Sequence, residues 1–307
     1  TNPFDSSGYT PIDERPGREA WDAQRTSGNT NTLNGKVLRI TPLPDGGYSI
    51  PEGNLFDEDE DTDNKTRPEI YAMGFRNPFR IGLDEQNNNI LVADYGPDAG
   101  TTSATRGPNG RVEWNILDEP GNYGWPYCVG DNTPYNDYNF SSSTAGAAFD
   151  CDNPVNDSPN NTGLTQLPPA KPAVMWQSNN PSITGTPEIG ASGAPMTSGT
   201  YAYDPDLVSD RKWPEYFDRK AIWADWNNSR LFTVQMNGDG SSYTDLNRFL
   251  PSLPMVRPHA LQFGPDGALY MIEWGSGFNG NNTDSGVYRI DYVEGNRAPV
   301  ARATTDR

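Results

Sequence analysis

The sequence has 307 residues, a net charge of −18, one histidine and two cysteines. Such a negative field repels phosphate backbones and anionic membranes, which argues against nucleic acids and lipid surfaces as partners. The chain combines 31 Gly and 28 Pro with eight Trp and 11 Phe. Gly and Pro favour tight turns between short strands, and the large aromatic side chains argue against disorder, the rival explanation for so polar a chain.

The predicted elements are short strands, because no segment keeps a helical apolar stripe for more than about two turns. Phe79–Gly96, followed after a long loop by Arg111–Leu117, has the same strand–turn–strand–loop–strand order as residues 260–292. A meander repeated every 40 to 50 residues or so is typical of a β-propeller blade, and a β-sandwich is the alternative. In chain order, strands are expected at residues 36–40, 80–84, 90–96, 111–117, 221–226, 230–236, 260–263, 268–275 and 286–292.

Residues 127–200 interrupt this rhythm and are predicted to be a loop-rich insertion on one face of the domain. Cys128 and Cys151 lie in it, and their loop setting favours a disulfide over a metal site. A disulfide there is worth roughly 3 kcal/mol in the chain-entropy model and implies an oxidising compartment, so we expect a secreted, extracellular protein. Residues 1–293 are predicted to be one partial propeller domain, and residues 294–307 to be a linker towards a C-terminal domain.

The acidic, asparagine-rich loops suggest a further function. Carboxylate and amide oxygens are the ligands that calcium prefers, so these loops favour calcium binding. The same acidity also keeps an extracellular protein soluble, and composition alone gives the two explanations about equal weight.

Three pairs of motifs carry a resemblance to a known family: Gly74–Pro78 with Tyr95–Asp98, Glu113–Asn115 with Gly121–Pro126, and Gly264–Tyr270 with Arg289–Tyr292. Their order and spacing resemble the glucose/sorbosone dehydrogenase family, whose soluble members use pyrroloquinoline quinone and calcium. The resemblance covers most of residues 30–292 and implies an all-β, six-bladed β-propeller, of which this chain supplies about four blades. It extends to large actinobacterial-like members that continue into a PKD domain.

The resemblance implies a set of cofactor-binding residues. Pyrroloquinoline quinone carries three carboxylates and an ortho-quinone, and Arg76 and Arg257 supply the planar cations that bind carboxylates. Asn77 is expected to donate to a quinone oxygen. His259 stands where better-known members carry a second arginine, and Asn227 where the family often has a lysine, so both depart from the family pattern.

The resemblance also implies metal ligands. The backbone carbonyls of Gly96 and Pro97 match those that bind the calcium next to the quinone, although a plain turn is the alternative. Glu113 matches a position in a second, structural calcium cluster.

The implied activity is oxidation of a sugar, with hydride transfer to the quinone and electrons passed to an external acceptor. The family's base histidine matches a position upstream of this sequence, so the catalytic residue stays unknown and we expect N-terminal blades from the same precursor. Two other functions stay open. One is a non-catalytic, calcium-stabilised extracellular propeller that binds carbohydrate or acts as a scaffold, which the departures at His259 and Asn227 favour. The other is a calcium-dependent lactonase.

Overall fold

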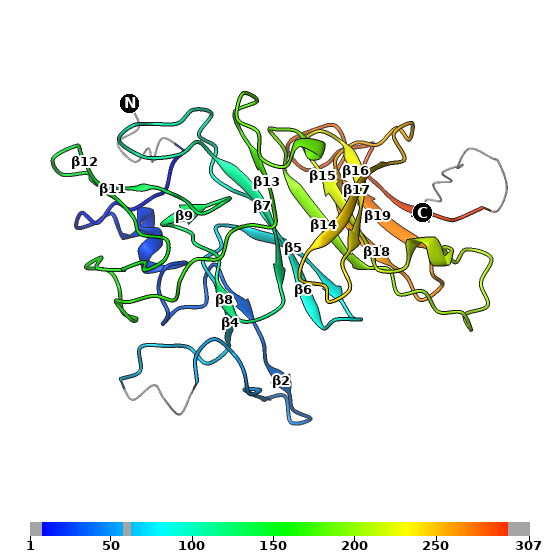
Figure 1. The fold of residues 1–307 in the computed structure, drawn as a ribbon, viewed down its shortest axis with the longest axis horizontal. Helices are drawn as coiled ribbons and strands as arrows, with labels where there is room; N and C mark the ends of the chain where they lie inside the picture. Colours follow the sequence, from blue (N-terminus) through cyan, green and yellow to red (C-terminus); the bar gives the residue numbers. More distant parts are fainter. Residues whose placement is uncertain (1–7, 58–62, 294–307) are drawn as a thin grey trace. The chain divides into compact units, whose positions relative to one another are not determined.

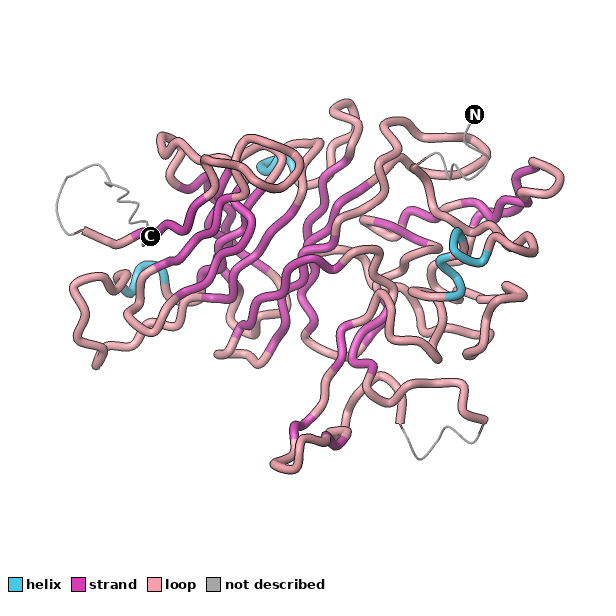
Figure 2. The backbone as a smooth tube through the Cα atoms, turned by 180° about the vertical axis from the view of Figure 1, so that it is seen from behind, coloured by secondary structure: helices cyan, strands magenta, loops and turns pink. Residues whose placement is uncertain are grey.

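The structure is a computed structural model that describes residues 8–57 and 63–293. The described chain is all-β: short strands are joined by turns and long loops, as Figure 1 and Figure 2 show. The linker predicted at residues 294–307 lies outside the described residues. Helical structure in the described ranges is limited to single 3-10 turns, η1 (Glu19–Trp21), η2 (Ala23–Arg25), η4 (Pro187–Ile189) and η5 (Glu215–Phe217).

The chain divides into two compact units. The first comprises the chain up to Pro78, Asp94–Glu113 and Glu119–Thr186, and the second comprises Phe79–Ala93, Trp114–Asp118 and the chain from Pro187 onward. The chain passes between the units within three strands, which form a sheet with β13 in the order β13-β7-β6-β5. These three strands are β5 (Pro78–Asp84), β6 (Asn89–Asp94) and β7 (Arg111–Leu117), and they confirm the upstream strand–turn–strand–loop–strand prediction.

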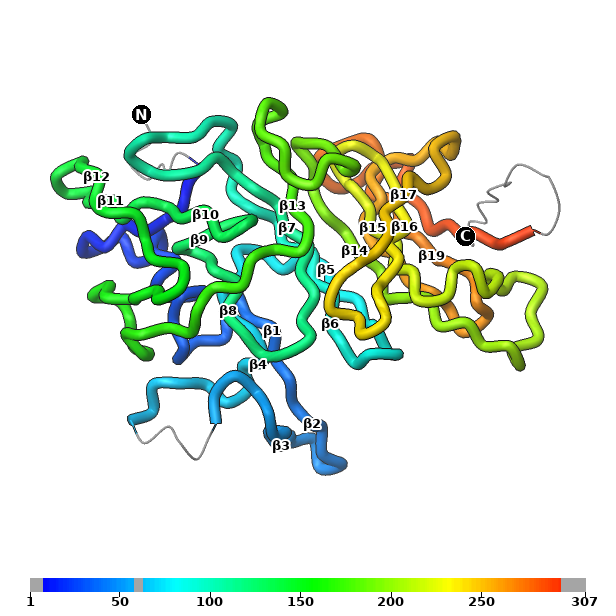
Figure 3. Tube along the Cα trace, in the orientation of Figure 1, coloured from blue at the N-terminus to red at the C-terminus, as the bar shows by residue number. Residues whose placement is uncertain are grey.

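The first unit is built from very short strands. Its central strand β4 is buried at all four residues, and it pairs antiparallel with β1 and parallel with β8. The segment predicted as an insertion contains the hairpins β9-β10 and β11-β12, which follow one another along the green part of the tube in Figure 3. The strands are β1 (Val37–Leu38), β2 (Thr41–Pro42), β3 (Tyr48–Ser49), β4 (Ile70–Met73), β8 (Gly121–Asn122), β9 (Cys128–Val129), β10 (Thr133–Pro134), β11 (Asn136–Asn139), β12 (Thr144–Ala148) and β13 (Met175–Ser178).

The predicted disulfide joins Cys128 and Cys151 in this unit. Cys128 is buried in a small core with Ile70, Met73 and Leu167. The bond therefore ties the long loop to the buried face of β4, and the prediction of a disulfide is confirmed.

The second unit contains two antiparallel meanders, with strand orders β14-β15-β16-β17 and β18-β19-β20. All six residues of β15 are buried, whereas the edge strand β17 is mostly exposed. The centre of β15, Ala221–Ala224, is a continuous apolar run, as expected for a strand covered on both faces, while β17 is polar. The strands are β14 (Pro195–Thr200), β15 (Lys220–Asp225), β16 (Arg230–Met236), β17 (Tyr243–Phe249), β18 (Pro258–Phe263), β19 (Leu269–Glu273) and β20 (Gly286–Ile290).

One tryptophan joins the two meanders of the second unit. The Trp213 indole packs against the rings of Phe217, Phe249 and Phe263, and its Nε1–H donates to the Ile290 carbonyl at 2.9 Å. A large aromatic side chain buries most apolar area where several strands converge, and its single polar atom is satisfied. Trp213 therefore anchors the core of this unit.

Candidate functional site

The turn at Arg76 and Asn77 is held by one buried carboxylate. Asp94, the last residue of β6, accepts the backbone N–H of Arg76 at 3.0 Å and that of Asn77 at 2.6 Å. Burial raises the pKa of Asp94 to about 6, and these hydrogen bonds act against that rise. The backbone carbonyl of Asn77 in turn accepts from the N–H of Tyr95 at 3.0 Å. The turn is thus fixed on both sides by residues about 18 positions downstream.

The glycine before this turn has no room for a side chain. Gly74 has φ of +80°, and a Cβ there would lie 2.7 Å from the backbone nitrogen of Gly124 and would overlap the Asn122 side chain. Phe75 follows and stacks on Tyr123, with ring centroids 5.0 Å apart. The Gly-Phe-Arg-Asn segment and the Asn-Tyr-Gly segment, both predicted from sequence as motifs, therefore pack directly against each other.

The side chains of the turn remain accessible. The half-buried Arg76 guanidinium donates through Nη1 to the Tyr95 carbonyl at 3.1 Å and lies about 6 Å from the Tyr95 and Trp125 rings. Asn77 is exposed. A planar cation braced by aromatic rings beside an exposed amide provides donors suited to an oxygen-rich, anionic ligand.

Gly96 and Pro97 are buried directly after this site, against the start of β7. A Cβ at Gly96 would overlap the Arg111 carbonyl, so the backbone passes too closely for any other residue. The Pro97 carbonyl accepts from Asn179 Nδ2 at 2.7 Å and faces Gly110, where a Cβ would overlap it. A cation at Pro97 would have to share this oxygen with the Asn179 amide. The predicted calcium ligands are thus adjacent, but one of them already has a protein donor.

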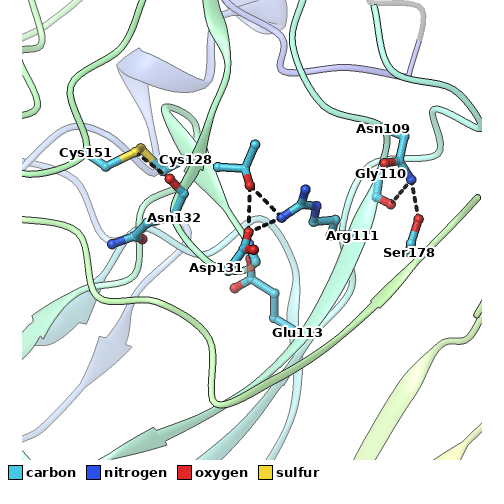
Figure 4. A network of polar contacts seen from close by, with 11 residues as sticks. Asn109, Gly110, Arg111, Glu113, Cys128, Asp131, Asn132, Cys151 and Ser178 are labelled. Atoms are coloured by element: carbon cyan, nitrogen blue, oxygen red, sulfur yellow. Dashed lines mark hydrogen bonds and ion pairs between the residues drawn. A yellow bond between two sulfur atoms is a disulfide. The ribbon is translucent and has the colours of Figure 1, made fainter. Parts of the chain in front are cut away.

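Glu113 lies in a polar network that contains a buried cation (Figure 4). Its Oε1 accepts the backbone N–H of Gly130 at 2.5 Å. Arg111, two residues earlier on β7, forms an ion pair with Asp131 and donates to the Thr133 hydroxyl at 2.8 Å. The guanidinium also lies 4.1 Å from the centre of the Trp176 ring. Glu113 and the buried Arg111 guanidinium are thus connected through neighbouring residues, Gly130 on one side and Asp131 on the other.

The second unit contains the other three predicted residues. Arg257 has φ of +58°, in the left-handed region that few non-glycine residues adopt. Its guanidinium covers the Trp226 ring at 4.7 Å and donates to the Ser276 carbonyl at 2.9 Å. Asn227, next to Trp226, is exposed and donates to the Ser192 carbonyl at 2.7 Å.

His259 lies between the Phe79 and Trp274 rings, with centroid distances of 5.3 and 5.0 Å. Its Nδ1 is buried and has no hydrogen-bond partner among the described residues. Burial lowers the pKa of His259, and the nearby Arg80 guanidinium lowers it further. A neutral imidazole with an unsatisfied ring nitrogen is suited to a hydrogen bond with a polar ligand and less suited to an ion pair with a carboxylate.

The structure thus brings the predicted residues into two groups, one in each unit. Arg76, Asn77, Gly96, Pro97 and Glu113 belong to the first, and Asn227, Arg257 and His259 to the second. A cavity of about 620 Å³ in the second unit is lined by parts of β5, β14 and β18, and none of these eight residues lines it.

Two residues of the site were not expected from the sequence, Asp94 and Arg111. Asp94 is the last residue of the buried strand β6, and Arg111 is the first residue of the buried strand β7. Charged residues are almost never buried unless they are paired. That feature was the available signal for both.

Two features are absent from the described residues. No group of three or more His, Cys, Asp or Glu side chains there is arranged to hold a metal ion. The described part of the chain also contains no helix with the length and apolar character that a membrane span requires.

Comparisons with known proteins point to one family. The sequence pattern of the Glucose / Sorbosone dehydrogenase family matches residues 16–156. The HIPL2 protein of Arabidopsis thaliana is 27% identical over 94% of this chain and 38% of its own length. Aldose sugar dehydrogenase YliI of Escherichia coli is 25% identical over 88% of this chain and 55% of its own length.

A solved structure of a glucose dehydrogenase matches 87% of this chain and 57% of its own chain, with 20% identity and a TM-score of 0.50, which supports the fold alone. The chain therefore spans roughly four to six tenths of the length of these three relatives.

Proposed function

Through residues 16–156 the chain belongs to the glucose/sorbosone dehydrogenase family, and from that membership we propose that it is part of a secreted sugar dehydrogenase that uses pyrroloquinoline quinone and calcium. We further propose that the whole domain is a six-bladed propeller, of which this chain supplies about four blades. Relatives whose names describe aldose sugar and glucose dehydrogenases support this proposal.

The Arg76–Asn77 turn is the observation that carries the proposal. Asp94 holds its backbone, so the guanidinium and the exposed amide project from a fixed frame. Groups held in advance bind a ligand at a lower entropic cost. In the proposed site Arg76 binds a cofactor carboxylate, and Asn77 donates to a quinone oxygen.

The family resemblance also assigns cofactor contacts to three residues of the second unit. Arg257 presents its guanidinium from a constrained backbone, His259 offers an unpaired ring nitrogen, and Asn227 is an exposed amide. The bound quinone supplies the hydride acceptor for sugar oxidation. The residues of this chain bind and orient that cofactor, and its calcium is assigned to the Gly96 and Pro97 carbonyls, with Pro97 shared with Asn179.

A second candidate function is a non-catalytic propeller that binds carbohydrate. The observation in its favour is the weaker charge of the second group, in which His259 and Asn227 replace an arginine and a lysine expected from the family resemblance. The lowered pKa of His259 keeps the imidazole neutral near pH 7 and weakens its attraction for carboxylates.

The test is a calorimetric titration of pyrroloquinoline quinone into the full-length protein, with and without calcium. We expect calcium-dependent, stoichiometric binding at micromolar affinity or better. Arg76→Met is expected to weaken binding at least ~10-fold, since a charge-assisted contact contributes about 1.5–3 kcal/mol. Arg39→Met is the matched control, because Arg39 also lies over an aromatic ring, Tyr71 at 4.8 Å, outside the proposed site.

Absence of binding in both conditions contradicts the dehydrogenase proposal and favours the carbohydrate-binding one. The second function is then tested with oligosaccharides as the titrant. Equal losses of quinone affinity in Arg76→Met and Arg39→Met contradict the assigned role of Arg76.

A further inference from the structure

We propose that the guanidinium of Arg111 is the structural cation of the region around Glu113, and that this region folds around that side chain without calcium. The family resemblance places a calcium cluster at Glu113. The proposal therefore concerns how this part of the first unit is stabilised, and it is independent of the proposed catalytic function.

Arg111 is a buried cation with directed contacts. It is 7% exposed and opens β7, and its Nη1 binds both the Asp131 carboxylate and the Thr133 hydroxyl. The Thr133 hydroxyl in turn donates to Asp131 at 2.6 Å. One face of the guanidinium lies over Trp176. A weakly hydrated, planar cation is suited to such a site, where it forms ion-pair and stacking contacts at once.

The backbone around Arg111 is shaped to admit this side chain. Gly130 has φ of +66°, and a Cβ there would lie 2.7 Å from Arg111 Cδ and 2.9 Å from Nη1. Only glycine both adopts this conformation readily and leaves room for the guanidinium. The N–H of the same Gly130 donates to Glu113, so one residue makes room for the cation and orients the carboxylate.

The Arg111 guanidinium also affects the pKa of the Asp131 carboxyl. Although partial burial acts to raise the pKa of Asp131, the Thr133 hydroxyl and the Arg111 guanidinium lower it below its usual range. Asp131 is thus held ionised as the partner of Arg111. A divalent ion at Glu113 would lie on the same strand as a buried positive charge two residues away, an arrangement that Coulomb repulsion disfavours.

The arrangement connects β7 with the segment that contains the disulfide. The β9-β10 hairpin pairs Thr133 with Val129 and Pro134 with Cys128, so Gly130 and Asp131 lie in its turn. Figure 4 shows Asp131 beside the Arg111 guanidinium and Cys128 bonded to Cys151. Arg111 therefore fixes on β7 the same hairpin that the disulfide fixes to Cys151. Structural metals commonly hold loops together in this way, and here a side chain supplies the positive charge.

The first arm of the test uses the full-length protein, with thermal unfolding measured in EDTA and in millimolar calcium. Wild type and Glu113→Gln are compared, because calcium bound elsewhere affects both equally. We expect the calcium-induced shift in unfolding temperature to be the same in the two proteins. A shift present in wild type and lost in Glu113→Gln shows that Glu113 binds calcium and overturns the proposal.

The second arm removes the cation. Arg111→Met keeps the length of the side chain without its charge and is expected to lower the unfolding temperature by roughly 5–10 °C, because the ion pair with Asp131, the hydrogen bond to Thr133 and the guanidinium contact with Trp176 are lost. Arg39→Met is the control, since Arg39 stacks on Tyr71 but donates to the neutral Asn54 side chain and the Glu52 carbonyl. Equal losses in both variants overturn the proposal. If Arg111→Met does not fold, the first arm alone decides.

A third arm tests for a cation site directly. Arg111→Ala opens a cavity beside the two carboxylates, and ethylguanidinium at millimolar concentration is expected to restore part of the lost unfolding temperature. Calcium is expected to stabilise this variant more than wild type. Failure of both cations to stabilise Arg111→Ala beyond wild type contradicts the assignment of a cation site.

Discussion

Asp94, the last residue of β6, is buried. Its carboxylate accepts the backbone N–H groups of Arg76 and Asn77 and so holds this turn. A carboxylate in this position costs free energy because it is desolvated, and it lowers that cost by accepting two N–H groups. Arg111 meets the same constraint with the opposite charge. At the residue scale, the candidate site is therefore organised by buried charges whose partners come from distant parts of the chain.

The raised pKa of Asp94 predicts a pH dependence of stability. Between about pH 4, where an unfolded aspartate ionises, and about 6, where Asp94 ionises in the folded protein, the folded state binds more protons. The free energy of unfolding therefore falls as pH rises through this window, by about 2–3 kcal/mol. Asp94→Asn does not titrate, so this fall should be absent from its denaturant unfolding curves measured from pH 4 to 7.

Asp98→Asn is the matched control, because Asp98 is exposed two residues beyond Gly96. It should retain the wild-type fall. If wild type and Asp94→Asn show the same pH dependence, another group is responsible and the assignment to Asp94 is wrong.

At the element scale, the two units keep their strands together by different means. In the second unit, long antiparallel strands such as β15 and β16 pair without a register shift, and Trp213 fills the space between the meanders. The first unit has many strands of only two residues, which provide few ladder hydrogen bonds. Its loops depend instead on side-chain hydrogen bonds, the Arg111 network and the disulfide.

Removal of the disulfide should therefore destabilise the first unit. The bond closes a loop with a sequence separation of 23, so its loss is expected to lower the free energy of unfolding by about 3 kcal/mol in the chain-entropy model. The double variant Cys128→Ala and Cys151→Ala is measured by chemical denaturation. Reductant should destabilise wild type and leave the double variant unchanged. Equal stability of wild type and the double variant would show that the loop is held by its other contacts alone.

At the scale of the whole molecule, the dominant property is the net charge of −18. Mutual repulsion among the carboxylates opposes the compact state, and salt screens it over a Debye length of about 8–10 Å at 0.1–0.15 M ionic strength. Glu14 shows this repulsion locally. Burial raises the pKa of Glu14, and the nearby carboxylates of Asp22, Asp137 and Asp157 raise it further.

We therefore expect the unfolding temperature to rise when ionic strength increases from about 0.01 M to about 0.15 M, where screening becomes effective. Sodium chloride and choline chloride should have equal effects if screening is the cause, and scanning fluorimetry measures both. A rise with sodium alone would indicate a specific cation site, and a fall in both salts would show that attractive ion pairs dominate.

Much of the fold follows from the local pattern of the chain. Apolar alternation and turn residues predicted the all-β class, the strands β15 and β16, the meander β18-β19-β20 and the copy formed by β5, β6 and β7. The outer strands of the other meander were missed, because β14 was placed in the insertion and β17 is a polar edge strand. The resemblance in the motif pairs agrees with the family match, and the two cysteines in one loop predicted the disulfide. These features are encoded by residues close together in the sequence, because strand periodicity and turn chemistry act over a few residues.

The electrostatic arrangement of the site was decided only by the tertiary structure. Asp94 lies 18 residues from Arg76, and Arg111 lies 20 residues from Asp131, so no local pattern reveals that either pair meets. The proposal for Glu113 rests on the same kind of contact, since Gly130 donates its N–H to Glu113 and leaves room for the Arg111 guanidinium. Buried charges are stable only with partners, and packing, not sequence proximity, determines which partners they have.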